Sequence, residues 1–180
     1  MRLLRLLLCA AVLVSVSAQA ADTFKIDPAK STIAFKVRHM LGSARGTFAK
    51  FSGTIVVDRD HPEQSSVNVS IDAASIDTGI AKRDDHLRGE LFDVAKYPQI
   101  TFRSRKVKQT GASGGEITGD LTMHGVTQPI TLSVELVSGR WRVKTPPLRR
   151  SQFGLVFSKS AETVSMISDE VAIEIEVEAK

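Results

Sequence analysis

Apolar and polar residues alternate over much of this chain. In residues 171–178, four aliphatic side chains occupy the odd positions, and Ala172 and three glutamates occupy the even ones. A period of two places successive side chains on opposite faces of a β-strand, whereas a helix would spread them around its circumference. The same alternation, in places weaker, recurs in residues 33–37, 55–57, 67–71, 100–102, 117–121, 130–136 and 141–143. The pattern predicts about eight strands or more, each with one buried face.

Short segments of turn-forming residues separate these strands, for example Asp27-Pro28, Gly114-Gly115 and Ser138-Gly139. Linkers this short join antiparallel neighbours. An antiparallel sheet of this size must either close on itself or pack face to face with a second sheet. Closure removes the strand edges, and a barrel of about eight strands has room for one small ligand. We therefore predict an all-β, antiparallel β-barrel formed by one domain, residues 21–180, with a two-sheet sandwich as the alternative.

Residues 80–92 depart from the strand pattern. Ile80, Leu87 and Leu91 follow a helical spacing, and Thr78 is placed to act as the N-cap. The residue before a proline is forced toward extended backbone, so Pro98 marks the return to a strand. We predict one or two helical turns here, near an opening of the barrel.

The first twenty residues have the features of a secretory signal. Arg2 and Arg5 precede an apolar run at residues 6–14, and Ala18-Gln19-Ala20 has the small-x-small form of a cleavage site. The run is shorter than the roughly 20 residues that span a bilayer. We predict export to the periplasm with cleavage after about Ala20, which removes Cys9, the only cysteine. The mature chain can then form no disulfide bond.

Charge and motifs argue against several functions. The formal net charge of +4 includes Arg2 and Arg5 of the leader, and basic and acidic residues are interspersed elsewhere, so we expect no nucleic-acid binding. The four histidines, His39, His61, His86 and His124, show no metal-binding spacing, and no Gly-x-Ser-x-Gly sequence occurs. We expect no metal, no cofactor and no catalytic residues.

The cluster Arg83-Asp84-Asp85-His86 has two compatible interpretations. It can be an ion-paired cap that holds the helical segment against the barrel. It can also be a polar collar above an apolar cavity, suited to a ligand with one polar end and a long hydrocarbon tail. The phenylalanines leave a similar choice open, because inward aromatic side chains in a barrel either fill the interior or line it.

Several sequence blocks, taken in order, resemble the YceI-like family of bacterial periplasmic proteins. They cover nearly the whole mature chain: Asp27-Pro28 with residues 31–39, residues 46–53, residues 67–79, Arg83-Asp84, His86-Leu87, Phe92-Asp93-Val94, Tyr97-Pro98, residues 119–127, and Arg150 with Phe153-Gly154. The resemblance implies a lipocalin-like barrel closed around a lipid tail, with a short helix near the opening.

From this resemblance and the strand pattern we expect a periplasmic carrier for a long-chain isoprenoid, polyprenyl or quinone-like, or for another amphiphilic lipid. A membrane-bound donor or acceptor of the lipid could be a partner, and a homodimer is compatible with the sequence. Arg83, Asp84 and His86 are expected near the entrance. The residues expected to contact the tail are Phe35, Val37, Phe48, Ile71, Leu87, Phe92, Phe102 and Phe153.

Two other functions are compatible with the sequence. One is an envelope stress or scaffold protein with a solid core and no ligand. The other is a hydrolase or isomerase of a lipophilic substrate, which would use His86 or His39 as base and Asp84 to orient it. We place the carrier first.

Overall fold

A computed structural model of the protein describes residues 21–157 and 166–180. The signal sequence predicted for residues 1–20 lies outside the described residues. The described chain is antiparallel and almost entirely β, with one helical insertion, as predicted. Its strands are β1 (Asp22–Lys25), β2 (Thr32–His39), β3 (Gly42–Phe48), β4 (Phe51–Val57), β5 (Ser66–Asp72), β6 (Ile76–Asp77), β7 (Gln99–Gln109), β8 (Gly114–Met123), β9 (Val126–Val137), β10 (Arg140–Lys144), β11 (Leu148–Arg149) and β12 (Glu170–Val177).

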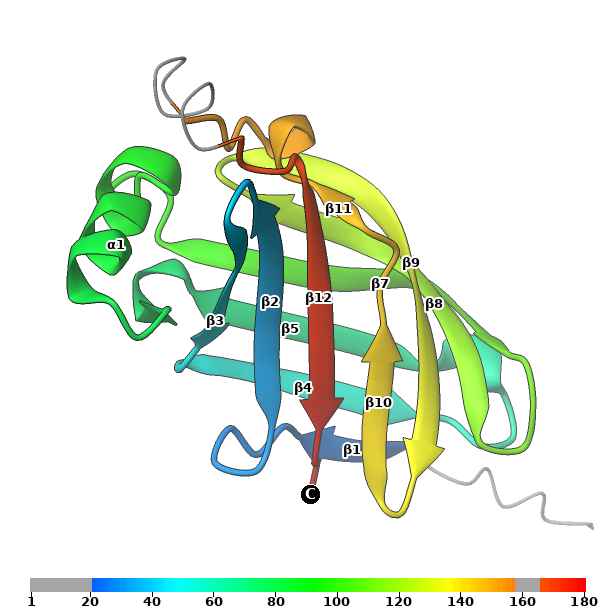
Figure 1. Ribbon diagram of the computed structural model, residues 1–180. Coiled ribbons are helices and arrows are strands. Elements are labelled where there is room, and N and C mark those ends of the chain that lie inside the picture. Colours follow the sequence, from blue (N-terminus) through cyan, green and yellow to red (C-terminus); the bar gives the residue numbers. More distant parts are fainter. Residues whose placement is uncertain (1–20, 158–165) are drawn as a thin grey trace, which may run out of the picture.

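All twelve strands belong to one sheet, in the order β1-β4-β5-β7-β8-β9-β10-β12-β2-β3-β6, with β11 paired to β12. The alternating segments of the sequence fall on eight of them, β2, β4, β5, β7, β8, β9, β10 and β12. Figure 1 shows β2, β12 and β10 upright across the front and β4, β5 and β7 running crosswise behind them. The sheet therefore curls around an interior as an incomplete barrel.

Short contacts bridge parts of the remaining gap. At one end the main chains of Lys25 and Lys180 exchange two hydrogen bonds of 2.7 and 3.0 Å, beside a bridge between Ile26 and Ala179. At the other end β6 pairs with β3, opposite Thr47 and Phe48. The lipocalin-like fold is thus present as a curled, incomplete barrel, and short contacts rather than full strand ladders link its edges.

Tight turns set the registers of two consecutive hairpins. His124 and Gly125, between β8 and β9, have φ angles of 52° and 75°. Ser138 and Gly139, between β9 and β10, have φ angles of 51° and 78°. Two positive φ values define the two-residue turn whose twist matches that of the flanking strands, and glycine adopts them at low cost.

The predicted helical segment consists of α1 (Ala81–His86) followed by a π-helical turn, η3 (Leu87–Leu91). Short 3₁₀ turns occur at η1 (Pro62–Gln64), η2 (Ala73–Ser75) and η4 (Arg150–Phe153). One detail of the prediction was wrong, because the N-cap is Ile80 rather than Thr78. The segment ends at Leu91, and a separate turn held by Asp93 leads into Pro98.

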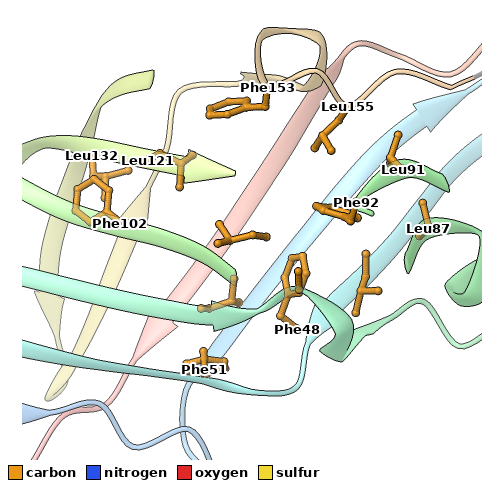
Figure 2. Close-up of a cluster of buried hydrophobic side chains, with 14 of the residues drawn as sticks. Phe48, Phe51, Leu87, Leu91, Phe92, Phe102, Leu121, Leu132, Phe153 and Leu155 are labelled. Atoms are coloured by element: carbon orange, nitrogen blue, oxygen red, sulfur yellow. The ribbon is translucent and has the colours of Figure 1, made fainter. Parts of the chain in front are cut away.

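The most deeply buried side chains lie where the helical segment meets the sheet. Phe153 and Ile76 are each 1% exposed, and Leu87, Leu91 and Phe92 are buried beside them. Figure 2 shows Leu87, Leu91 and Phe92 near Phe48, Phe153 and Leu155, with Phe102, Leu121 and Leu132 farther along the sheet. All of them belong to one continuous hydrophobic core. No helix in the described ranges is both long and apolar enough to cross a bilayer.

Candidate functional site

The front wall of the barrel interior is formed by β2 and β12. Phe35 pairs with Ile173, and Val37 pairs with Val171. Directly paired residues of antiparallel strands point to the same face, so these four side chains share the inner face with the buried Ile33. All four are only partly buried. This wall is apolar and remains accessible.

The same partial burial continues on the neighbouring strands. On β10 and β9, Val143 pairs with Val134, and both are half-buried members of the layer around the core. On the crosswise strands behind, Val69 and the predicted site residue Ile71 also belong to this layer. Half-buried apolar side chains thus continue from β2 and β12 onto β9, β10 and β5, where they pack around the core.

Two phenylalanines lie over glycines of adjacent strands. Phe35 lies over Gly46 of β3, its directly paired residue. Phe102 lies over Gly119 of β8. A ring occupies the space that a side chain would otherwise take, so the glycines let each ring lie flat along the wall.

Aromatic rings connect the wall to the helical segment. The ring centroids of Phe35 and Phe48 are 5.8 Å apart, and those of Phe48 and Phe92 are 6.1 Å apart in an edge-to-face arrangement. Separations of this size are favourable for aromatic pairs. Three predicted tail-contact residues therefore form one cluster beneath η3, and the buried Leu87 lies beside it.

Asp84 is only 5% exposed and is the centre of a compact network at the start of α1. Its carboxylate accepts hydrogen bonds from the Thr78 main-chain N–H at 2.9 Å and from the Thr78 hydroxyl at 2.5 Å. Arg83 donates from Nε to the same hydroxyl and from a terminal nitrogen to the Thr78 carbonyl. Asp84 and Arg83 thus hold the start of the helical segment through Thr78, as in the first of the two interpretations, but by hydrogen bonds rather than by an ion pair with each other.

His86, expected near the entrance, lies at the end of α1. Its ring stacks on Phe157 at 6.0 Å and 2°, and its Nδ1 is 3.1 Å from the Glu90 carboxylate. The guanidinium of Arg150 also lies over the Phe157 ring, 5.1 Å from its centroid. His86 therefore contacts the segment that follows η4 rather than Asp84.

Arg150 was not predicted as a buried residue, because Arg149-Arg150 has the appearance of a solvated cluster. It is 7% exposed and donates to the main-chain carbonyls of Leu155 at 2.7 Å and of Ser168 at 3.2 Å. These two hydrogen bonds link Leu155, just before residues 156–167, to Ser168, just after them. The sequence offered one indication of a structural role for Arg150, because Arg150 and Phe153-Gly154 together form one of the blocks that resemble the family.

Beside Arg150, Asp169 caps the start of η4. Burial alone would raise the pKa of Asp169, but hydrogen bonds from the Ser151 hydroxyl and N–H, with the charges of Arg150 and Arg149, lower it below its usual value. This carboxylate is therefore committed to a structural role. The described residues contain no group of three histidine, cysteine, aspartate or glutamate side chains positioned to hold a metal ion.

The eleven predicted site residues thus do not gather at one place. Phe35, Phe48, Leu87 and Phe92 come together beneath the helical segment. Val37 and Ile71 lie on the walls, and Phe102 and Phe153 lie in separate parts of the core. Arg83 and Asp84 hold the start of α1, and His86 lies at its end.

A family model described as YceI-like domain matches residues 24–179. A UPF0312 protein of Vibrio parahaemolyticus is 43% identical over 134 residues, which cover 72% of this chain and 70% of the relative. Protein YceI of Escherichia coli is 45% identical over 125 residues, covering 67% of this chain and 64% of that protein, slightly less than two thirds of its length.

Solved structures share the fold. BcnA of Burkholderia cenocepacia superposes with a TM-score of 0.76 at 30% identity, covering 84% of this chain and 98% of BcnA. A polyisoprenoid binding domain from Saccharophagus degradans superposes with a TM-score of 0.64 at 22% identity, covering 87% of this chain and 97% of the domain. The family model spans nearly all of the described residues, and the chain belongs to the YceI-like family.

Proposed function

We propose that this protein is a periplasmic carrier that holds a long-chain isoprenoid, polyprenyl or quinone-like, or another amphiphilic lipid inside its curled sheet. The observation that carries the proposal is the apolar inner wall of β2 and β12, whose paired side chains remain partly accessible. In a solid core such residues would be buried by opposing side chains. An accessible apolar wall supplies contact area for a hydrocarbon chain instead.

Tail burial provides enough free energy for binding. Each methylene group removed from water contributes about 0.8 kcal/mol, so a long isoprenoid needs few polar contacts. The polar groups of the helical segment are already engaged, since Asp84 is bound by Thr78 and His86 faces Phe157 and Glu90. Selection of the ligand therefore rests on chain length and shape more than on the head group.

The comparison with solved structures supports the same ligand class. The Saccharophagus domain is described as polyisoprenoid binding, and at 22% identity it shares with this chain the fold alone. The leader-like residues 1–20 support a periplasmic location. The enzyme hypothesis has weaker support, because His86 and Asp84 have separate partners and do not form a base and its orienting acid.

Native mass spectrometry of the mature protein, purified from a bacterial periplasm, tests the proposal. We expect a mass excess equal to one lipid, released on denaturation and identified as an isoprenoid or another amphiphile. An apoprotein that also takes up no isoprenoid from added solanesol would contradict the carrier function and favour a scaffold.

A pair of neighbouring substitutions locates the ligand. Ile173 faces the interior, and Ala172 is exposed on the outer face of the same strand opposite Lys36. Ile173→Glu places a charge on the proposed tail path, where desolvation makes it unfavourable, so we expect at least a tenfold loss of lipid binding. Ala172→Glu is the matched control and should bind as the unchanged protein does. Equal retention of lipid by both variants would exclude this wall as the binding site.

A further inference from the structure

The turn of the β2–β3 hairpin exposes two large apolar side chains. Met40 is 61% exposed and Leu41 is 87% exposed, the highest value among the large hydrophobic residues that the structure describes as exposed. Neither side chain contributes to the core of the sheet. Their exposure is therefore not explained by packing within the described chain.

Two further apolar residues lie at the same end of the molecule. Val156 is 55% exposed and Met166 is 64% exposed. Arg150 donates hydrogen bonds to the main-chain carbonyls of the residues just before Val156 and just after Met166. Ser168 donates its N–H to the carbonyl of Arg38 at 2.9 Å, which ties this segment to the hairpin, as the upper part of Figure 1 shows. The exposed apolar side chains of the hairpin turn and of this segment therefore lie at one end of the molecule.

The stem of the hairpin is basic. Between residues 36 and 45 the sequence has three cations, Lys36, Arg38 and Arg45, and no carboxylate. Lys36 and Arg45 are directly paired across the two strands, an arrangement that costs stability because like charges oppose each other. None of the three forms an ion pair within the described part of the chain. Asp77 and Glu174 line a groove of about 230 Å³ beside Lys36 and Arg45 without coming within ion-pair distance.

We propose that the β2–β3 hairpin docks the protein on an anionic lipid bilayer. Met40 and Leu41 enter the boundary between head groups and acyl chains, and Arg38, Lys36 and Arg45 contact the lipid phosphates. Apolar residues that project beyond basic ones are the combination that holds protein segments at a membrane interface.

The inference rests on the proposed carrier function, because docking matters for collecting or delivering a lipid. The docked end also carries the contact between His86 and Phe157, which joins the helical segment to the chain after η4. A bilayer bound there lies next to the proposed entrance. A hydrocarbon tail can then pass between bilayer and barrel without crossing water.

Flotation of the mature protein with vesicles measures the docking directly. One set contains phosphatidylethanolamine and phosphatidylglycerol, and the other contains phosphatidylcholine alone. We expect binding to the anionic set. Removing a cation near an anionic surface lowers partitioning by about fivefold, so R38Q/R45Q, which removes two, should bind roughly twenty-five-fold more weakly. M40S/L41S loses the buried apolar area and should bind at least tenfold more weakly to the same vesicles.

Matched variants control for general changes in charge and hydrophobicity. L136S removes an exposed apolar residue of β9, away from the hairpin. K106Q/K108Q removes two exposed cations of β7 that form no ion pair in the described chain. Both should bind vesicles as the unchanged protein does. Circular dichroism of each variant verifies that the fold is intact, and the R38Q/R45Q result stands if M40S/L41S is unfolded.

Three results would overturn the inference. Wild-type binding by M40S/L41S or by R38Q/R45Q would show that the hairpin does not dock. Equal losses in the control variants would show a nonspecific effect. A dimer in sedimentation velocity that M40S/L41S dissociates would assign the tip to a second copy. Lipid retention in native mass spectrometry is a separate measurement, so a docking failure with lipid still bound leaves the carrier function standing.

Discussion

Gly46 shows how one small residue shapes the interior wall. A Cβ atom at this position would lie 2.5 Å from the tip of the Phe35 ring and 2.8 Å from the carbonyl oxygen of Asp77. The ring is held by the wall on one side and by Phe48 on the other. Neither the ring nor the main chain of β6 can easily move away. The glycine therefore determines where this part of the wall lies.

Gly46→Ala should destabilise the protein, because overpacking a confined site costs about 1–3 kcal/mol. Urea unfolding followed by circular dichroism measures the change in the free energy of unfolding. Gly89→Ala is the control, because a Cβ atom at Gly89 in η3 would meet nothing within 4 Å. This substitution should leave stability unchanged or raise it by up to about 1 kcal/mol through helix propensity. Equal destabilisation of both variants would contradict the packing argument.

Among the elements, strands with alternating apolar residues could be predicted from the sequence, including the five-residue β10, whereas β3 (Gly42–Phe48) shows no such alternation. β12 follows the predicted pattern of aliphatic residues inside and glutamates outside. Strands such as β6 (Ile76–Asp77) and β11 (Leu148–Arg149) have two residues each, too few to carry a period. The irregular register of β7 against β8 between Ser104 and Lys106 is likewise fixed by pairing, which no local pattern encodes.

The helical segment was predicted from its spacing, but the way it is anchored was not. A cap is usually sought before the helix, and Thr78 fitted that rule. In the structure the carboxylate lies within α1 and reaches back, so that Asp84 accepts the hydrogen bonds that Thr78 donates. From the sequence spacing, either Thr78 could cap the helix or Asp84 could accept hydrogen bonds from Thr78. The structure shows the second arrangement, with Asp84 buried.

Asp84→Ala should destabilise the protein by about 1–3 kcal/mol, because it leaves the Thr78 N–H without its partner. Asp85→Ala is the matched control, since Asp85 is exposed and pairs with Arg88 three residues later at 3.1 Å, a contact worth about 0.3–0.5 kcal/mol. Hydrogen exchange of residues 78–91 should rise in the first variant and hardly change in the second. Similar exchange in both would show that the Asp84 network does not hold the segment.

In the whole molecule, the candidate site brings together residues from distant strands and from the helical segment, which the sequence indicated only one segment at a time. The phenylalanines were predicted to matter, but their distribution into a wall, an aromatic cluster and a core group depends on strand order. Arg150 escaped the prediction because a buried guanidinium that bonds main-chain carbonyls has no sequence signature. Contacts between distant segments, such as Ser168 with Arg38, are set by the fold as a whole.

Closure of the curled sheet also depends on charges near the end of the chain. Lys180 donates to Asp27 at 2.9 Å, and Lys30 donates to Glu178 at 2.8 Å. The hydrogen bond from Lys180 is the main cause that lowers the pKa of Asp27, and that from Lys30 lowers the pKa of Glu178. The pKa of Lys180 is raised in turn by Asp27. These pairs lie beside the bridge between β1 and the end of β12.

Stability should therefore fall in acid as these carboxylates become protonated. A carboxyl group whose pKa is lower in the folded state stabilises it above its unfolded pKa, and this contribution is lost as pH falls through the folded value. Asp27→Asn should lower the urea midpoint at neutral pH and flatten its dependence on pH below about 4. Asp60→Asn, at an exposed loop position, should leave the profile unchanged. An unaltered acid profile in Asp27→Asn would show that this closure contributes no stability.

The hydrogen bonds between Lys25 and Lys180 bring the first strand and the last described residue together, away from the β2–β3 hairpin. A short peptide could join these two ends into a continuous ring, and new ends could be opened between Gly111 and Ser113, in the exposed connection from β7 to β8. Such a circular permutant would retain every strand pairing. The arrangement also means that a label or a surface linkage at either end leaves the hairpin and the helical segment free.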